Sequence, residues 1–411
     1  MNNYDVLIIG GGAAGLCCAD YLRMNDKNIS VAVAEQLQRV GKKLITTGNG
    51  RCNITNSDER MERYHSKNIE FFRFALEKYN NEIIESFFEK IGVNIIYDNE
   101  GRGYPESLQA SSVVDALRFS ASENGVEILT ETKVIDYKKT AGGYKIFTSS
   151  GELFSKTVII ASGLYSGGKK LGSNGEIFEL LRSKGYGSVK TKPAIVQIKT
   201  DNSVTKSLKG IKVNADVCLK SGKTLLRKEF GEVLFCDYGL SGPPVMQISG
   251  EAENGMIISL DIMPGLNKKE LFDLLKRRRK FLEYRDVSEF FTGMLNKRVG
   301  QSILKSANIR SETVCKNISD EKLQSLSNLI KDMRFEIIGN TGYENSQVTS
   351  GGIGTEFFDN KTLMSKKETN LYVIGEIFDI YGDCGGFNLH WAWSGAMCCA
   401  DSVIKAFGGA K

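Results

Sequence analysis

The sequence predicts an α/β fold with a parallel sheet, interrupted by an insertion of different character. Three observations predict it. Residues 4–35 have the pattern of a strand, a glycine-rich turn, a helix and a second strand. Residues 371–407 again have a strand, a glycine-rich loop and a helix. Residues 192–332 change first to short alternating strands and then to a charged helical pattern. We therefore predict a Rossmann-like domain with an inserted antiparallel β domain and a small helical subdomain.

The first segment carries a nucleotide-binding fingerprint. The apolar strand at residues 4–9 leads into Gly10, Gly12 and Gly15, which have the spacing G-x-G-x-x-G. The first glycine permits a tight turn, the second lets the backbone approach a pyrophosphate, and the third lets the helix pack close to the sheet. Glu35 ends the second strand, where a carboxylate can bind ribose hydroxyls. Because all parts follow in order, we predict dinucleotide binding rather than a purely structural turn.

The late strand favours FAD as the dinucleotide. Residues 371–376, LYVIGE, form a short apolar strand that ends in Gly375 and Glu376. A fold that holds FAD needs such a return, because the first segment holds the ADP half and a late loop holds the ribityl chain and the ring. No second G-x-G-x-x-G with a strand before it occurs in the sequence. We therefore expect NAD(P)H to act as a transient reductant without a Rossmann domain of its own.

Composition excludes several classes of protein. No apolar stretch reaches the ~18 residues of a membrane span, and the chain starts directly on a strand, so we expect neither a membrane helix nor a signal peptide. The nine cysteines do not resemble a disulfide framework and favour a reducing cytoplasm. The two histidines, His65 and His390, exclude a His-rich metal site, and no metal is expected. The net charge of +5 is only weak support for nucleic-acid binding.

The middle of the chain has the character of an insertion. Short alternating strands between residues 192 and 263 indicate an antiparallel barrel or sandwich. The basic run at residues 276–280 favours a solvated helix face over a nucleic-acid contact. Strand character returns at residues 333–338, where we expect the chain to rejoin the first domain. The predicted domains are a discontinuous FAD-binding domain (1–191 and 334–411), an inserted β domain (192–267) and a helical subdomain (268–333).

Several motifs together resemble a known family. They are GKKLITTGNGRCNITN at 41–56, VLFCDYGLSGPP at 233–244, TSGG at 349–352, TLMSK at 362–366 and GEIFDIYGDCGGFNLHWAWSG at 375–395. From about residue 4 to about residue 406 the chain resembles the FAD-dependent oxidoreductase family of BaiN, a 3-dehydro-bile acid Δ4,6-reductase, aminoacetone oxidase and YhiN-like flavoproteins. The resemblance implies a split FAD domain, an inserted β-barrel and a helical subdomain. Relatives often have Thr-His or Thr-Glu where this chain has Cys236-Asp237, so a histidine-dependent role there does not carry over.

Two glycine-rich blocks are predicted to surround the cofactor. Lysines just after Glu35 can balance the pyrophosphate charge. Arg51 can stabilise negative charge on the reduced flavin, or it pairs with an acid and only fixes its loop. We expect Cys52 to be a small residue beside the ring rather than a redox thiol. The predicted cofactor contacts beyond the first fingerprint are Ala14, Gly41, Lys42, Lys43, Thr47, Gly48, Asn49, Arg51, Cys52, Asn53, Val134, Gly163, Gly375, Glu376, Asp383, Gly386, Asn388 and Leu389.

The last block leads into a helix whose positive N-terminus can point at the flavin O2 region. His390 lies near enough in sequence to be a proton donor, although a core histidine is the commoner case. Trp391 and Trp393 are two residues apart and cannot share one helix face, so at most one is expected to line a pocket. Tyr238, from the inserted domain, is the other predicted proton donor.

These features predict a FAD-dependent oxidoreductase. The leading hypothesis is NAD(P)H-dependent reduction of a conjugated C=C in a 3-oxo bile acid or steroid-like substrate, with Tyr238 or His390 as proton donor. The alternative is a FAD-dependent amine oxidase of the aminoacetone-oxidase type, which converts O2 to H2O2. A tRNA-modifying flavoprotein and a non-catalytic flavin sensor are remote alternatives. We expect a small-molecule substrate, with neither nucleic acid nor membrane as partner.

Overall fold

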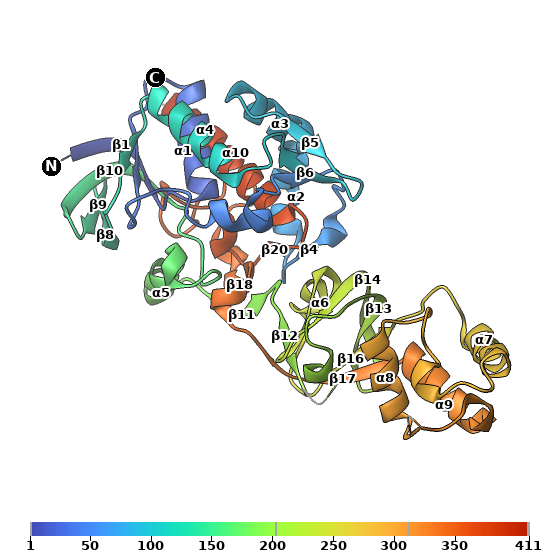
Figure 1. Ribbon diagram of the computed structural model, residues 1–411. Helices are drawn as coiled ribbons and strands as arrows, with labels where there is room; N and C mark the ends of the chain where they lie inside the picture. Colours follow the sequence, from blue (N-terminus) through green and yellow to red (C-terminus); the bar gives the residue numbers. More distant parts are fainter. Residues whose placement is uncertain (1, 202–203, 311, 409–411) are drawn as a thin grey trace. The chain divides into compact units, whose positions relative to one another are not determined.

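The computed structural model describes residues 2–201, 204–310 and 312–408 (Figure 1). The chain forms two compact units, Met1–Pro193 with Tyr343–Lys411 and Ala194–Gly342. Each unit has its own cluster of buried apolar side chains. The first unit is therefore discontinuous in sequence, and the second is inserted into it.

A seven-stranded sheet forms the centre of the first unit. Its order is β7-β2-β1-β10-β9-β8, and β19 also pairs with β10. The pairs β1–β2, β2–β7, β1–β10 and β10–β19 are parallel, whereas β8–β9 and β9–β10 are antiparallel. The strands are β1 (Asn2–Ile9), β2 (Val31–Ala34), β7 (Glu127–Leu129), β8 (Val134–Thr140), β9 (Gly143–Thr148), β10 (Gly151–Ile160) and β19 (Leu371–Val373).

The central strand shows why this sequence forms a buried parallel sheet. Val6, Leu7 and Ile8 of β1 are all fully buried, although they alternate between the two faces. A continuous apolar run of this kind is typical of a parallel strand that is covered on both faces. On its outer side, β10 pairs with β9 through residues 151–155 and with β19 through residues 158–160. The late strand β19 thus joins the sheet beside the carboxyl end of β10.

Helices α1 (Ala13–Asn25), α4 (Ala110–Glu123) and α10 (Phe387–Gly408) accompany the sheet, and α1 packs against both α4 and α10 (Figure 1). Helices α2 (Glu70–Lys78) and α3 (Asn81–Lys90) pack against α10, and α5 (Glu176–Ser183) contacts β8 and β18. The unit also contains 3₁₀ helices η1 (Leu44–Gly50), η2 (Met61–Arg63), η3 (Lys169–Leu171), η7 (Tyr343–Asn345), η8 (Thr355–Phe357) and η9 (Gly375–Ile377).

Three small sheets are described besides the main sheet and the barrel. Strands β3 (Thr55–Asn56), β6 (Arg102–Pro105) and β5 (Ile95–Tyr97) form one of them. The other two are pairs: β20 (Tyr381–Gly382) with β4 (Tyr64–His65), and β11 (Ser188–Ala194) with β18 (Val348–Ile353).

The second unit contains a closed six-stranded barrel with order β12-β15-β14-β13-β16-β17. All its pairings are antiparallel. Closure removes the unpaired strand edges that an open sheet would expose. The strands are β12 (Ile198–Thr200), β13 (Lys212–Ser221), β14 (Thr224–Phe235), β15 (Gly239–Ser241), β16 (Ile257–Asp261) and β17 (Met333–Asn340).

The described residues of this unit form four α-helices: α6 (Pro243–Ile248), α7 (Lys268–Phe281), α8 (Lys297–Ser306) and α9 (Asp320–Lys331). It also contains 3₁₀ helices η4 (Lys206–Leu208), η5 (Val287–Glu289) and η6 (Cys315–Asn317). Helix α7 begins in a capping box, because the Asn267 side chain accepts from the N–H groups of the first turn and Glu270 returns a bond to the Asn267 backbone. Leu323, Leu326 and Ile330 of α9 are buried, and α9 packs against both α7 and α8.

The predicted fold class is confirmed, and the insertion is a barrel rather than a sandwich. One boundary differs from the sequence expectation. We expected residues 333–338 to return the chain to the first domain, but β17 pairs with β12 and β16 and closes the barrel. Local strand character does not identify the sheet that a strand joins; here the pairing with two barrel strands decides it.

Candidate functional site

The turn after β1 contains two glycines, Gly10 and Gly15, that no other residue could replace without movement. Gly10 has φ +108°, and a Cβ there would lie 2.6 Å from the Ala161 carbonyl oxygen. A Cβ on Gly15 would lie 1.9 Å from the Gly10 carbonyl oxygen. Gly12 differs, because no atom of the described residues lies within 4 Å of a Cβ built there. The inner side of the turn is therefore closely packed, while Gly12 leaves space on its outer side.

Helix α1 starts at this open side. Gly12 is its N-cap residue, with no side-chain cap and no acidic residue in the first turn. The first N–H groups and the positive end of the helix are thus available to an anion. The late loop comes close to the same turn, since a Cβ on Gly375 would lie 3.1 Å from the Ala14 Cβ. The structure brings the two predicted cofactor loops together at the start of α1.

Glu35 is buried and already holds the turn. Its Oε2 accepts a hydrogen bond from the Gly11 N–H at 2.8 Å, and its Oε1 accepts one from the Leu37 N–H at 2.9 Å. The Gly41 N–H donates to the Gly11 carbonyl oxygen at 2.8 Å. Gly41 therefore lies next to the glycine turn in space, and Glu35 anchors that turn; its contact with a ribose stays a prediction.

Lys43 and Glu376 are paired with each other. The Lys43 Nζ lies 2.5 Å from Glu376 Oε2 and also donates to Ser166 Oγ. Glu376 Oε1 accepts from the Thr349 N–H at 2.8 Å and from Ser166. Lys42, by contrast, is exposed. Ser166 and Thr349 are not among the residues predicted from the sequence, although Thr349 opens the TSGG motif and Ser166 follows the small-residue end of β10.

The loop at residues 47–53 has a strongly left-handed backbone. Gly48, Asn49 and Gly50 have φ of +56°, +56° and +82°, and Cys52 has φ +61°. The Thr47 hydroxyl donates to the Leu44 carbonyl oxygen at 2.7 Å. The Arg51 and Cys52 N–H groups close this turn, because they donate to the Gly48 and Thr47 carbonyl oxygens at 3.2 and 3.1 Å. These bonds keep the loop compact.

Arg51 lies over an aromatic ring rather than beside an acid. Its guanidinium carbon is 4.8 Å from the Tyr104 ring centroid, and its Nε donates to the Gly48 carbonyl oxygen at 3.3 Å. Within the described part of the chain, no carboxylate pairs with it. The positive charge is therefore held near the loop without being neutralised, as the predicted electrostatic role requires.

Cys52 and Asn53 continue the loop into the core. Burial raises the pKa of the Cys52 thiol to about 12, so the group is a thiol at neutral pH, as expected for a packed residue. The Asn53 amide, with its nitrogen facing the acceptors, donates to the Thr55 and Gly103 carbonyl oxygens at 3.0 and 3.2 Å. Its oxygen accepts from the Gly386 N–H at 3.2 Å. Asn53 thus links the first glycine-rich block to the last.

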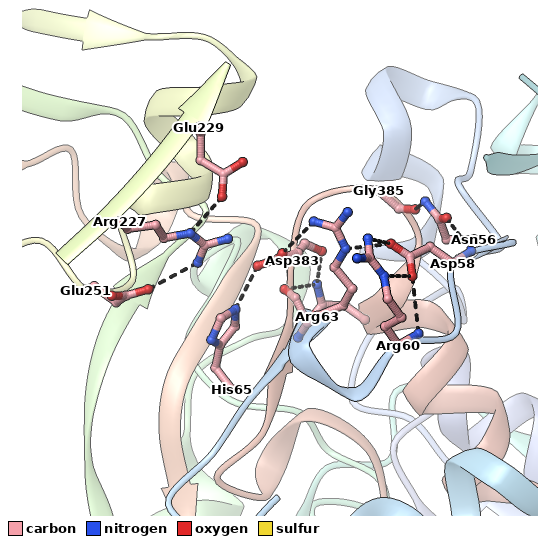
Figure 2. A network of polar contacts seen from close by, with 12 residues as sticks. Asn56, Asp58, Arg60, Arg63, His65, Arg227, Glu229, Glu251, Asp383 and Gly385 are labelled. Atoms are coloured by element: carbon pink, nitrogen blue, oxygen red, sulfur yellow. Dashed lines mark hydrogen bonds and ion pairs between the residues drawn. The ribbon is translucent and has the colours of Figure 1, made fainter. Parts of the chain in front are cut away.

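The last block is fixed by a carboxylate network (Figure 2). Asp383 is buried, and its two oxygens lie 2.7 Å from His65 Nε2 and 3.3 Å from an Arg63 nitrogen. The His65 ring stacks on Tyr381, with centroids 4.8 Å apart. Asn388 clamps the turn, because its amide donates to the Gly382 carbonyl oxygen at 2.8 Å and its Oδ1 accepts from the Gly382 N–H at 2.7 Å. Asp383 and Asn388, both predicted cofactor contacts, shape the loop at the start of α10.

Gly386 sits tightly in this loop, with φ +106° and a Cβ position 2.2 Å from the Thr55 carbonyl oxygen. His390 follows in α10, and its Nδ1 lies 2.8 Å from the Thr55 hydroxyl. Burial lowers the pKa of His390 to about 4, so the ring is neutral at neutral pH. Its environment is that of a hydrogen-bonded core histidine. Trp391 and Trp393 are also buried, and their Nε1 atoms donate to the Gly375 and Ile54 carbonyl oxygens at 3.1 and 3.0 Å.

The remaining predicted residues lie further apart. Gly163 has φ +64°, and a Cβ there would lie 3.9 Å from Glu376 Oε2. Val134 is buried at the start of β8, and Leu389 is half-buried in α10. Tyr238 belongs to the other unit, in the turn between β14 and β15, where burial raises the pKa of its phenol. The two predicted proton donors, Tyr238 and His390, are thus described in different units.

In the described ranges, no cluster of three or more His, Cys, Asp or Glu side chains could hold a metal ion. None of the helices described here is both long and apolar enough to cross a membrane.

Comparison with known proteins identifies the family. Residues 4–402 match the family described as HI0933-like protein, Rossmann domain. The chain belongs to the HI0933-like family. It is 32% identical over 393 residues to the 3-dehydro-bile acid delta(4,6)-reductase of Clostridium scindens, a match that covers 94% of this chain and 96% of that protein. The predicted family and the coarse class of flavin-dependent oxidoreductase are confirmed.

The HI0933-like chain has other full-length similarities. It is 28% identical over 406 residues to the ribosomal RNA dihydrouridine synthase of Haemophilus influenzae, covering 97% of this chain and 98% of that protein. Among solved structures, the 3-ketosteroid-delta4-(5alpha)-dehydrogenase of Rhodococcus jostii RHA1 matches with a TM-score of 0.51 at 14% identity, covering 98% of this chain and 97% of that one. At this identity the structural likeness concerns the fold alone.

Proposed function

We propose that this chain uses FAD to reduce a carbon–carbon double bond that is conjugated with a carbonyl group. The observation that carries the proposal is the near full-length similarity to a delta(4,6)-reductase at 32% identity. A 3-oxo-Δ4,6 bile acid and a uracil base both contain a C=C conjugated with C=O. The names of the two relatives therefore describe one chemistry on two different substrates.

The residues at the start of α1 fit FAD. Gly12 leaves open space where a pyrophosphate would lie against the uncapped helix N-terminus. Glu35 is proposed to bind the adenosine ribose, and the glycine-rich loop at residues 48–52 is proposed to lie beside the ring. When bound, FAD supplies the two-electron chemistry, and the protein supplies orientation and electrostatics.

The protein has three tasks in this reaction. It must hold the conjugated carbonyl, keep water away from the reacting carbons, and deliver a proton to the α-carbon. No described carboxylate neutralises the charge of Arg51. We propose that this charge stabilises the negative charge of the reduced flavin. Tyr238 is the proposed proton donor, because His390 is a buried, neutral core residue that is hydrogen-bonded to Thr55.

The leading substrate class is an apolar, ring-containing 3-oxo-Δ4 or Δ4,6 bile acid or steroid, with NADH or NADPH as reductant. The second candidate is a uracil base in ribosomal RNA, which the full-length similarity to a ribosomal RNA dihydrouridine synthase favours. Both candidates predict a product that has gained two hydrogens.

The test uses the FAD-loaded protein without oxygen. It is incubated with NADH or NADPH and either a 3-oxo-Δ4 bile acid or an unmodified ribosomal RNA transcript, and the products are examined by mass spectrometry. A gain of two hydrogens in either substrate supports the proposal. Gly12→Ala is the matched control, because it should lack cofactor while keeping the fold. Absence of reduction, together with peroxide formation from aminoacetone in air, would instead support the amine-oxidase alternative.

A further inference from the structure

The C-terminal end of α7 carries a solvent-facing group of aromatic and basic side chains. Lys280 and Phe281 come three and four residues after Arg277, and Tyr284 comes four and three residues after them, which places all four along one side of the helix and the turn after it. Phe281 is 79% exposed and Tyr284 is 81% exposed. The Lys316 ammonium lies 5.9 Å from the Tyr284 ring centroid. We call these five residues the α7 tip.

The five basic residues at 276–280 fall into two groups: three that bond to neighbouring residues and two that form no ion pair with any described residue. Lys276 and Arg279 both pair with Asp320, at 2.9 and 2.8 Å. Arg278 donates to the carbonyl oxygens of residues 290 and 292. These three residues stabilise the helix and its surroundings. Arg277 and Lys280 are exposed and form no ion pair with any described residue.

The exposed aromatics are not a misplaced part of the core. The apolar side of α7 already packs into the apolar core of its unit, because Leu271 and Leu275 are fully buried there. Phe281 and Tyr284 lie beyond that apolar side and leave their ring surfaces to solvent. Single exposed apolar residues are common, but two aromatic rings beside unpaired cations form the arrangement that stacks bases and holds phosphates.

The charge of the whole unit agrees with this arrangement. Residues 194–342 contain 24 Lys and Arg against 18 Asp and Glu, so the net positive charge of the chain, +5, comes from the inserted unit. A polyanion would therefore be attracted to this unit rather than to the nucleotide-binding unit.

We propose that the α7 tip docks a single-stranded segment of RNA, with bases stacked on Phe281 and Tyr284 and phosphates held by Arg277, Lys280 and Lys316. The inference rests on the proposed reduction of a conjugated C=C and takes up its second candidate substrate, a uracil base in RNA. An anionic membrane is the less suitable partner, because α7 has no free apolar face to insert and offers only two exposed rings.

The test measures binding and chemistry separately on the FAD-loaded protein. Fluorescence anisotropy with a labelled uridine-rich single-stranded RNA gives the affinity at several salt concentrations. The double variant Phe281→Ala/Tyr284→Ala should bind about tenfold more weakly or worse, since each stacked base is lost. The variant Arg277→Gln/Lys280→Gln should lower the slope of log affinity against log salt by about 1.4, because two phosphate contacts are lost on a single strand.

The matched control is Arg118→Gln/Phe119→Ala, which removes a cation and a half-exposed ring that lie together on α4 of the other unit. It should leave the affinity for RNA unchanged. All variants should keep their FAD and reduce the small 3-oxo-Δ4 substrate like the wild type if that substrate is accepted.

The outcomes separate the two proposals. Loss of RNA affinity in both tip variants, but not in the control, supports the docking surface. Wild-type protein that does not bind the RNA, tip variants that bind it normally, or capture by phosphatidylserine vesicles in place of RNA would each overturn it. Normal reduction of a conjugated C=C in any of these cases leaves the proposed function standing, whereas RNA binding without any C=C reduction overturns that function alone.

Discussion

The Lys43 ammonium lies 2.5 Å from the Glu376 carboxylate, and this pair joins residues that are 333 positions apart in the sequence. The same carboxylate accepts from the Thr349 N–H and from Ser166. Loops that follow β2, β10 and β19 therefore meet at one side chain. Because ligands of open α/β sheets bind at the carboxyl ends of the parallel strands, this carboxylate fixes the region where the cofactor is proposed to lie.

Glu376→Gln should lower the free energy of unfolding of the cofactor-free protein by about 1–3 kcal/mol. The amide keeps the shape of the side chain but loses the charge-assisted bonds, and it leaves a partly buried Lys43 without its counter-ion. Urea unfolding measures the change. The control is Glu77→Gln, which removes one partner of the exposed Arg73 pair and should cost at most about 0.5 kcal/mol. Equal stability of the two variants would show that the Lys43–Glu376 pair contributes nothing.

Gly12→Ala and Gly15→Ala should separate cofactor binding from folding. A Cβ on Gly12 meets no described atom and the backbone there has φ −83°, so the cofactor-free variant should be as stable as the wild type within about 1 kcal/mol. Its FAD content should nevertheless fall, because the methyl group occupies the phosphate space. Gly15→Ala should destabilise the fold by more than about 3 kcal/mol, since its Cβ would lie 1.9 Å from the Gly10 carbonyl oxygen. Full FAD content in Gly12→Ala would place the phosphates elsewhere.

Glu35→Ala should weaken FAD binding by about 1–3 kcal/mol, because the ribose hydroxyls lose a charged partner. The structure adds a second effect: the Gly11 and Leu37 N–H groups lose their acceptor, so the cofactor-free protein should also unfold at lower temperature. Flavin fluorescence quenching gives the affinity and thermal unfolding gives the stability. Glu35→Gln, which keeps an acceptor oxygen, should recover part of the stability and little of the affinity. Heat-released flavin that migrates as FMN would contradict the assignment altogether.

The parts of the site that the sequence predicted are those with local causes. The demands on Gly10, Gly12 and Gly15 arise within one turn, and Glu35 follows at the end of the next strand, so their spacing alone indicates their tasks. The left-handed backbone of the loop at residues 48–52 was not predicted, although it has a local cause in the glycines and the asparagine of the loop. These features need no knowledge of which distant segments meet.

The parts that the sequence did not predict depend on distant contacts. Lys43 and Glu376 were each assigned to the cofactor, and nothing in their local sequence indicated that they pair with each other. Strand β17 has the alternation of any half-buried strand, and only its register with β12 and β16 places it in the barrel. The network of Arg63, His65 and Asp383 is formed by the short β4–β20 pair, which no periodicity indicates.

The burial of His390 predicts an acid-sensitive fold. In the folded chain its pKa is lowered to about 4 by burial, whereas an exposed histidine in the unfolded chain titrates near 6.5. Between these values the unfolded state binds a proton that the folded state does not, so stability falls as the pH drops from about 6.5 to about 4, by up to about 3 kcal/mol. Above pH 6.5 both states are neutral, and below pH 4 the loss is complete.

Urea unfolding of the wild type and His390→Gln across this range isolates the contribution, because the variant lacks the titrating group and can keep a hydrogen bond to Thr55. The difference in unfolding free energy between wild type and variant should be constant above pH 6.5 and should shift against the wild type below it. His65→Gln removes the other histidine. This variant should keep the loss of unfolding free energy that His390 causes between about pH 6.5 and about pH 4. Parallel pH profiles for the wild type and His390→Gln would show that the imidazole is not buried as a neutral group.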